Sequence, residues 1–402
     1  MIPLEEAQKF VLGSCDVLGT AEVPLLDALG LTCAEDVRAT DPIPPQANTA
    51  MDGFAVRADD TAQAPSRLRL VGSLAAGSAE MPQVRPGQAV RIMTGAPIPP
   101  GADAIVIVED TVTTGEWVEV RSAASRGDHI RPGGSDVQVG DVVVARTTEL
   151  RPAHLGLLAS VGREQVAAVR RPVVGVLSTG DELVQGGTEL LRGQIRDSNR
   201  PSLLASVRAS GFQAMDLGCV PDEPDAIRRA LSAGVEKCDA ILTSGGVSVG
   251  DYDYTKAVLD SLSDGSMRWM QVAIKPAKPF AFGVVKDVPV FGLPGNPVSS
   301  LVSFECFARP ALRKMAGFSL LHRPRVTALA AEDFRRRRDG KLHLLRVVAE
   351  PDSDGRFRVR SSGGQSSHQL SAMGSANALA LLADGEGLMA GDSVDTLLLY
   401  GC

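Results

Sequence analysis

The sequence predicts a multidomain protein of the α/β plus β class, with a three-layer α/β/α domain, an inserted β-rich domain and a small C-terminal β-barrel. Three observations support this fold class. After residue 172, strand-like apolar runs alternate with helical stretches, which is typical of a mostly parallel sheet covered by helices on both faces. Residues 41–145 and 321–402 instead carry short β-like runs separated by Gly, Pro and Asp. The 402 residues correspond to two to four domains of ordinary size.

The β-rich residues 41–145 are flanked by segments of helical character. Residues 3–18 place apolar side chains on one helical face, and residues 153–161 also read as a helix. We therefore expect residues 1–40 and 146–170 to form one discontinuous helical domain with the β-rich domain inserted. The α/β domain then takes residues 171–320, and the barrel takes residues 321–402.

Composition excludes several classes of protein. The net charge of −7 argues against a general nucleic-acid surface, and we treat the basic run Arg335–Arg338 as a solvated loop or hairpin. The six cysteines form no CxxC pair, so reduced thiols fit better than disulfides or zinc. No apolar run approaches 18 residues and the first residues do not form a signal peptide, so we expect a cytoplasmic protein that does not enter membranes.

Four polar motifs of the α/β region follow predicted strands. Ligands of open parallel sheets bind just beyond the carboxyl ends of the strands, so the four motifs together predict one composite site. Taken singly, each motif also fits an ordinary turn. The motifs are Ser178–Leu183, Ile195–Asn199, Thr243–Asp253 and Gly292–Ser299.

The residue types in these motifs suit phosphate and a hard cation. Glycine turns let backbone N–H groups approach a phosphate, and serine hydroxyls add donors. Lys275 and Lys278 follow another strand and offer ammonium groups to an oxyanion. Carboxylates repel a phosphate, so their number implies a bridging cation, most plausibly Mg²⁺. These carboxylates belong to Asp181, Glu182, Asp251 and Asp253.

The motifs resemble those of two families that act on molybdopterin. Thr243–Asp253 resembles the molybdopterin-binding loop that the MoeA and MogA families share, and the other three motifs resemble the remaining signatures of that MogA-like domain. The β-rich domain distinguishes the two families. Asn48–Val56, Arg91–Pro97 and Arg131–Asp136 resemble MoeA signatures, in the family's order. The resemblance to the MoeA family, which includes the E domain of gephyrin, covers essentially the whole chain.

This resemblance implies an elongated homodimer of four-domain subunits that works in molybdenum cofactor biosynthesis. Such an enzyme inserts molybdate into adenylylated molybdopterin, with Mg²⁺-dependent release of AMP. Position by position, it implies catalytic roles for Asp52, Thr94, Glu182, Asp222 and Asp253. It implies metal binding by Asp52, Asp136, Glu182, Asp251 and Asp253. Substrate contacts fall on Ser178, Gly180, Asp181, Ser198, Ser244, Gly245, Gly246, Ser248, Lys275, Lys278, Pro294, Asn296 and Pro297.

The resemblance also implies that the site is shared between subunits. Asp52, Thr94 and Asp136 would face the α/β domain of the other subunit. Two of the acids have ordinary structural interpretations as well, since Asp222 could cap a helix and Asp52 could belong to an Asp-Gly turn. Ser361–His368 resembles the family's Ser/Gly/His stretch near the cleft, whereas Gln271 stands where the family sometimes carries a basic residue.

Other functions remain open. A MogA-type molybdopterin adenylyltransferase would share the α/β motifs but needs no β-rich domain. A gephyrin-like scaffold would need a second domain and a linker, for which we see no room. A relative that prefers tungstate is a third possibility. A separate MogA-type adenylyltransferase and molybdoenzyme acceptors are the expected partners, alongside the pterin substrate.

Overall fold

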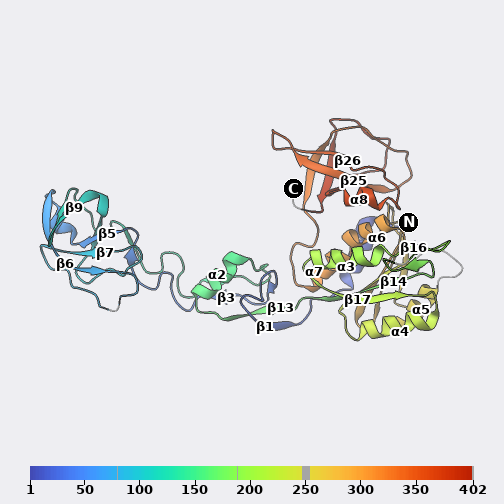
Figure 1. Ribbon diagram of the computed structural model, residues 1–402, viewed down its shortest axis with the longest axis horizontal. Coiled ribbons are helices and arrows are strands. Elements are labelled where there is room, and N and C mark those ends of the chain that lie inside the picture. Colours follow the sequence, from blue (N-terminus) through green and yellow to red (C-terminus); the bar gives the residue numbers. More distant parts are fainter. Residues whose placement is uncertain (79, 188, 247–253, 401–402) are drawn as a thin grey trace.

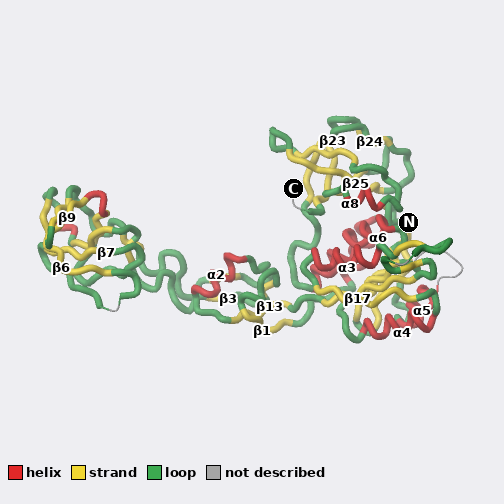
Figure 2. The backbone as a smooth tube through the Cα atoms, in the orientation of Figure 1, coloured by secondary structure: helices red, strands yellow, loops and turns green. Residues whose placement is uncertain are grey.

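The protein is elongated, with its β-rich module at one end and two domains packed together at the other (Figure 1). The computed structural model describes residues 1–78, 80–187, 189–246 and 254–400. A narrow connecting segment joins the two ends (Figure 2). No helix among the described residues is long and apolar enough to cross a membrane.

The α/β domain is built on a six-stranded sheet of order β17-β14-β18-β22-β21-β19. The first four strands run parallel, and β21 and β19 are antiparallel to their neighbours. Lys286 and Asp287 both have positive φ, which suits the two-residue turn that joins β21 to β22. The strands are β14 (Val173–Thr179), β17 (Gln213–Val220), β18 (Ala240–Ser244), β19 (Arg268–Gln271), β21 (Pro279–Val285) and β22 (Val288–Leu293).

Helices cover both faces of this sheet, which confirms the three-layer α/β/α arrangement. One apolar cluster joins one face to α1, α3, α6, η3 and α7, and a second joins the other face to α4 and α5. The helices are α3 (Asn199–Ala209), α4 (Pro224–Val235), α5 (Tyr254–Leu262), α6 (Pro297–Ser303), the π-helical η3 (Phe304–Ala308) and α7 (Arg309–Met315). A short parallel pair, β15 (Leu183–Val184) and β16 (Ile195–Arg196), lies at the carboxyl edge.

The first helix, α1 (Leu4–Gly13), packs on the α/β domain and not with the connecting segment where the sequence placed it. Ala7 and Val11 are fully buried in the α/β core, and the Gln8 amide donates a 2.9 Å hydrogen bond to the Cys306 carbonyl. An amphipathic pattern fixes which face of a helix is buried but not which domain covers it, and for this reason the sequence misplaced the helix.

The connecting segment contains more strand than the sequence predicted. Its three-stranded sheet has the order β1-β13-β2, and residues 25–30 form a series of turns. These strands pair residues that are distant in sequence, so local propensity could not reveal them. The elements are β1 (Thr20–Pro24), β2 (Thr32–Cys33), β3 (Val37–Arg38), β12 (Val142–Val144), α2 (Pro152–Ser160) and β13 (Gln165–Val169).

The β-rich module is joined to this segment through two paired strands, β3 and β12. Its main sheet has the order β8-β5-β7-β6-β10-β9, and β4 pairs with β11. The strands are β4 (Asn48–Thr49), β5 (Gly53–Val56), β6 (Ser66–Leu74), β7 (Gln88–Ile92), β8 (Ala104–Ile107), β9 (Thr111–Thr114), β10 (Trp117–Val120) and β11 (Ile130–Arg131). Two 3₁₀ turns, η1 (Ala58–Thr61) and η2 (Val108–Asp110), complete it.

The C-terminal domain is a closed five-stranded barrel, as the sequence predicted. Its strands follow the order β25-β26-β23-β29-β27, and β27 pairs back onto β25. Strand β20 (Ile274–Lys275) of the α/β domain adds to β25 and so joins the two domains. The barrel elements are β23 (Arg325–Ala330), β24 (Phe334–Arg335), β25 (Leu342–Pro351), β26 (Phe357–Ser361), α8 (Leu370–Gly374), β27 (Ala378–Leu382), β28 (Gly387–Leu388) and β29 (Ser393–Leu398).

The Gly53→Ala variant is expected to destabilise the β-rich module by about 1–3 kcal/mol, the usual cost of overpacking. A Cβ at Gly53 would lie 2.1 Å from the carbonyl oxygen of Val106 on the paired strand. Calorimetric unfolding and hydrogen exchange of the module measure the effect. Gly156→Ala in α2 is the control, because a Cβ there meets nothing within 4 Å. Equal behaviour of the two variants would contradict the packing argument.

Candidate functional site

The polar motifs of the α/β domain converge on one edge of the sheet. Ser178 at the end of β14 lies in register with Ser244 at the end of β18, and Ser244 lies in register with Leu293 at the end of β22. Both serines are buried. The strand ends therefore bring the described parts of three predicted motifs to one place.

The two glycines after β18 are required by the backbone. Gly245 and Gly246 have φ of +97° and +68°. A Cβ at Gly246 would lie 2.3 Å from Cβ of Thr255, and one at Gly245 would lie 2.8 Å from the carbonyl oxygen of Thr179. Only glycine allows this close approach of the turn to Thr179 and Thr255. Phosphate binding by the turn stays a prediction.

Asn199 links the end of β18 to the loop before α6. It was not among the predicted site residues. Its amide nitrogen donates 2.7 Å hydrogen bonds to Ser244 Oγ and to the Gly295 carbonyl. Its buried Oδ1 has no hydrogen-bond partner among the described residues. The sequence signal was its place in the motif Ile195–Asn199, directly after Ser198, which precedes α3.

Three predicted acids gather beside the ends of β14 and β17. The Asp222 backbone N–H donates a 3.0 Å hydrogen bond to Asp181 Oδ1. Burial raises the pKa of Asp222, and the neighbouring charges of Asp181 and Glu182 raise it further. A carboxylate with a raised pKa between two others would be stabilised by a cation. Even so, no group of three or more His, Cys, Asp or Glu side chains among the described residues is arranged to hold a metal.

A large cavity lies between the α/β domain and the barrel. Its volume is about 730 Å³, and Lys275, Lys278 and Lys341 contribute its charged groups. Asn296 and Ser299 line it from the start of α6, and residues 365–368 line it from the barrel. These barrel residues belong to the Ser361–His368 stretch noted in the sequence, although none was among the predicted site residues.

Arg346 holds the barrel side of the cavity in place. Its side chain is almost completely buried, and it donates hydrogen bonds of 3.2 and 3.3 Å to the carbonyls of Gly364 and Ser366. The Gln365 side chain binds both the N–H and the carbonyl of Arg346. No sequence signal indicated this role, because a lone arginine in a strand does not reveal that it is buried.

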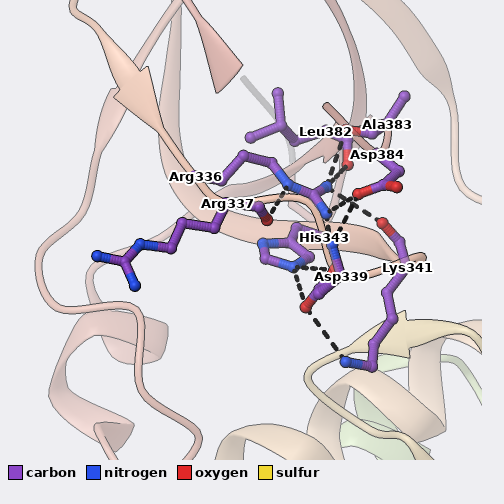
Figure 3. A network of polar contacts seen from close by, with 8 residues as sticks. All are labelled: Arg336, Arg337, Asp339, Lys341, His343, Leu382, Ala383 and Asp384. Carbon is purple, nitrogen blue, oxygen red and sulfur yellow. Dashed lines mark hydrogen bonds and ion pairs between the residues drawn. The ribbon is translucent and has the colours of Figure 1, made fainter. Parts of the chain in front are cut away.

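A polar network fixes the other side of Lys341 (Figure 3). Asp339 accepts hydrogen bonds from Lys341 and contacts the His343 ring, and these contacts outweigh burial and hold the pKa of Asp339 at about 2. Arg336 donates to the carbonyls of Lys341, Leu382 and Ala383. The run 335–338 is therefore partly structural, since Arg336 is buried while Arg337 and Arg338 are exposed.

The predicted residues of the β-rich module lie outside the α/β domain. Asp52 directly precedes β5 and Thr94 follows β7, both labelled in the module at one end of Figure 1. Asp136 lies where the module adjoins the connecting segment, because its neighbour Val137 packs against Val161. Asp52 Oδ1 accepts a 2.6 Å hydrogen bond from the Thr94 backbone N–H and a 2.7 Å bond from its hydroxyl. These two bonds lower the pKa of Asp52. Asp136 is also exposed, and within one chain none of the three approaches the α/β edge.

The remaining predicted residues have varied positions. Gly180 and Asp181 follow β14, Pro294 follows β22, and Pro297 begins α6. Ser248, Asp251 and Asp253 lie outside the described residues, so their predicted roles remain predictions.

Three family models match successive parts of the chain. Residues 2–162 match the MoeA N-terminal region (domain I and II), residues 175–314 match a probable molybdopterin binding domain, and residues 327–399 match the MoeA C-terminal region (domain IV). These matches define the class of protein: a molybdopterin-binding domain flanked by MoeA-type domains.

Curated relatives and a solved structure agree over the full length. The chain is 37% identical to a molybdopterin molybdenumtransferase of Haemophilus influenzae, with 98% of both chains covered. It is 38% identical to molybdopterin molybdenumtransferase 2 of Mycobacterium tuberculosis, covering 94% of this chain and 95% of the relative. The crystal structure of the molybdopterin biosynthesis MoeA protein from Pyrococcus horikoshii covers 100% of both chains, with 29% identity and a TM-score of 0.82. The chain belongs to the MoeA family of molybdopterin molybdenumtransferases, as the sequence motifs predicted.

Replacing Thr94 by Val is expected to raise the pKa of Asp52 part of the way to its ordinary value. The variant removes the hydroxyl donor, while the backbone N–H of residue 94 still donates to Asp52. Carbon-13 NMR titration of the Asp52 carboxyl measures the change. Thr113→Val, an exposed replacement in β9 of the same module, is the control and should leave this pKa unchanged. An unchanged pKa in the Thr94 variant would rule out the hydroxyl contribution.

Proposed function

We propose that this transferase inserts molybdate into adenylylated molybdopterin and releases AMP in a Mg²⁺-dependent step. One observation carries the proposal: the sheet edge and the lysine-lined cavity adjoin at one loop. Gly295 accepts a hydrogen bond from Asn199 of the sheet edge, and the next residue, Asn296, lines the cavity. The edge suits a phosphate and the cavity suits a second, smaller oxyanion. Two anionic substrates are what this reaction requires.

The pterin nucleotide is assigned to the sheet edge. Gly245 and Gly246 follow β18 in a turn with positive φ, whose backbone N–H groups are the proposed phosphate donors, and the buried hydroxyls of Ser178 and Ser244 lie at the adjoining strand ends. Asn199 ties this turn to the loop before α6, so the two phosphate-facing segments keep a fixed separation. The unpartnered Asn199 Oδ1 is an acceptor that a substrate N–H or hydroxyl could use.

Molybdate is assigned to the cavity between the domains. Molybdate is a tetrahedral dianion, which needs cations and hydrogen-bond donors. Lys275, Lys278 and Lys341 provide the charge, while Ser299 and Ser366 provide donors. The soft sulfur ligands for the metal come from the pterin dithiolene, which agrees with the raised pKa values of the buried, inert protein thiols Cys15 and Cys306.

The Mg²⁺ site is proposed to need a second copy of the chain. Asp181, Glu182 and Asp222 form an acidic group that does not by itself complete a metal site among the described residues. Asp52 and Asp136 are exposed on an arm that cannot reach this group within its own chain. In a homodimer, the arm of one copy would bring these two acids to the α/β edge of the other. The bound cation would offset charge on the cleaved phosphoanhydride.

Two alternative functions account for fewer of the structural features. A MogA-type adenylyltransferase needs only the α/β domain and leaves the Asp52–Thr94 arrangement unexplained. A gephyrin-like scaffold leaves the lysine cavity unexplained. We further propose a cytoplasmic setting, which suits the free thiols of the described cysteines, with a MogA-type adenylyltransferase as donor of the pterin nucleotide and molybdoenzymes as acceptors.

AMP release from adenylylated molybdopterin by the purified protein is expected to require both molybdate and Mg²⁺. The Glu182→Gln variant should lose about 10²-fold or more of this activity, because it removes one carboxylate from the proposed Mg²⁺ site and so weakens the cation that offsets charge on the phosphoanhydride. Glu236→Gln, at the C-terminal end of α4, is the matched control and should retain wild-type activity. Formation of the adenylate from ATP would instead support the adenylyltransferase, and binding without release would support a scaffold.

Mixing two inactive variants is expected to restore activity if the site is shared between subunits. Asp52→Asn and Glu182→Gln each inactivate both sites of a homodimer. After subunit exchange, half of the dimers are mixed and each carries one intact site, so roughly one quarter of the wild-type rate should return. Native mass spectrometry verifies the exchange. Mixed dimers without activity would show that Asp52 and Glu182 act within one chain or not at all.

A further inference from the structure

A second cationic cavity lies where the connecting segment meets the α/β domain, far from the β-rich module. Its volume is about 280 Å³, and it is lined from both parts. Gly30, Leu31 and Glu149 come from the connecting segment, whereas Arg309 and Arg313 come from α7. Figure 1 shows α7 and α3 on the side of the α/β domain that faces the connecting segment. The cavity therefore sits at the root of the arm that carries Asp52.

Arg309 brings a poorly compensated charge to this cavity. It is only 7% exposed, and its guanidinium donates one 3.3 Å hydrogen bond to the Leu321 carbonyl. Its buried Nε has no hydrogen-bond partner among the described residues. The carboxylate of Glu305 lies 3.9 Å away but already accepts two 2.9 Å hydrogen bonds from Arg323. Burial, and after it the charge of Arg323, lower the pKa of Arg309 to about 10.

Two more guanidinium groups line the same cavity. Arg171 donates to the Leu29 carbonyl at 3.1 Å, and its buried Nε also lacks a partner in the described part of the chain. Arg313 lies 3.6 Å from Glu149, whose side chain is 40% exposed, so water screens that pair. The described lining thus combines three guanidinium groups with one half-exposed carboxylate. A buried excess of positive charge is costly unless an anion offsets it.

We propose that this junction cavity is a binding site for a tetrahedral oxyanion of the phosphate class, either inorganic phosphate or the phosphate of a nucleoside monophosphate. Guanidinium forks match such oxygens in geometry and charge. A water molecule takes about 30 Å³ in the liquid, so the cavity holds one hydrated oxyanion. Because its walls come from both parts, a bound anion ties the arm to the α/β domain and restricts the position of Asp52.

Hydrogen exchange with inorganic phosphate as the probe tests this site. The backbone N–H groups of Gly30 and Leu150 donate to carbonyls within the connecting segment beside the cavity. Phosphate, compared with chloride at equal ionic strength, is expected to slow exchange at these amides while leaving strand β7 of the distant module unchanged. AMP in place of phosphate distinguishes the two sources: protection by phosphate identifies the free ion, and protection by AMP alone identifies a monoester.

Two variants with opposite expected effects on phosphate affinity distinguish a loss of binding from a loss of folding. Arg171→Gln should weaken phosphate binding about tenfold, because one charge-assisted contact is lost. Glu149→Gln should tighten it several-fold, since the variant removes the carboxylate that repels the anion. Arg170→Gln is the control, because Arg170 pairs with Asp239 and does not line the cavity. Absence of protection by both anions in the wild-type protein, or equal effects of the Arg171 and Glu149 variants, would overturn the proposal.

Discussion

The parallel pairing of β14, β18 and β22 is the constraint on which the site depends. Parallel strands in register end at the same edge, so Ser178, Ser244 and Leu293 are brought together although they are far apart in the sequence. Everything placed beyond that edge follows from it, including the tight glycine turn at Gly245 and the amide of Asn199 that links the turn to the next loop. A slip of one residue would turn these side chains to the opposite face of the sheet.

The barrel contributes to the site because it is fused to the α/β domain at one strand. Pairing of β20 with β25 fixes the backbone of Lys275 against the barrel, and the two domains share one apolar cluster. The lysine cavity is therefore a rigid junction between domains. Arg346 also stabilises this junction, because its buried guanidinium donates hydrogen bonds to the barrel loop that lines the cavity opposite Lys275 and Lys278.

The arm, formed by the β-rich module and the connecting segment, is attached to the α/β domain less firmly than the barrel is. Its β-rich module has its own apolar clusters and reaches the rest of the chain only through the narrow connecting segment. Asp52 is held in place by two hydrogen bonds from Thr94 within this module. In the proposed shared site, activity would depend on the position of the β-rich module, and the guanidinium-lined junction cavity lies between the connecting segment and the α/β domain.

The sequence alone determined the class of fold and most of the residues at the sheet edge. Alternation of strands and helices after residue 172 marked the α/β domain, and turns with Gly, Ser and Asp after its strands marked the edge that we propose binds substrate. Such signals are local, so one sequence reveals them. Tertiary structure decided what local signals cannot encode. It placed α1 on the α/β core, built the connecting segment from distant strands, buried Arg346 in the barrel and put Asp52 and Glu182 in different domains. Each of these depends on contacts between residues remote in sequence, whose partners are fixed only when the whole chain packs.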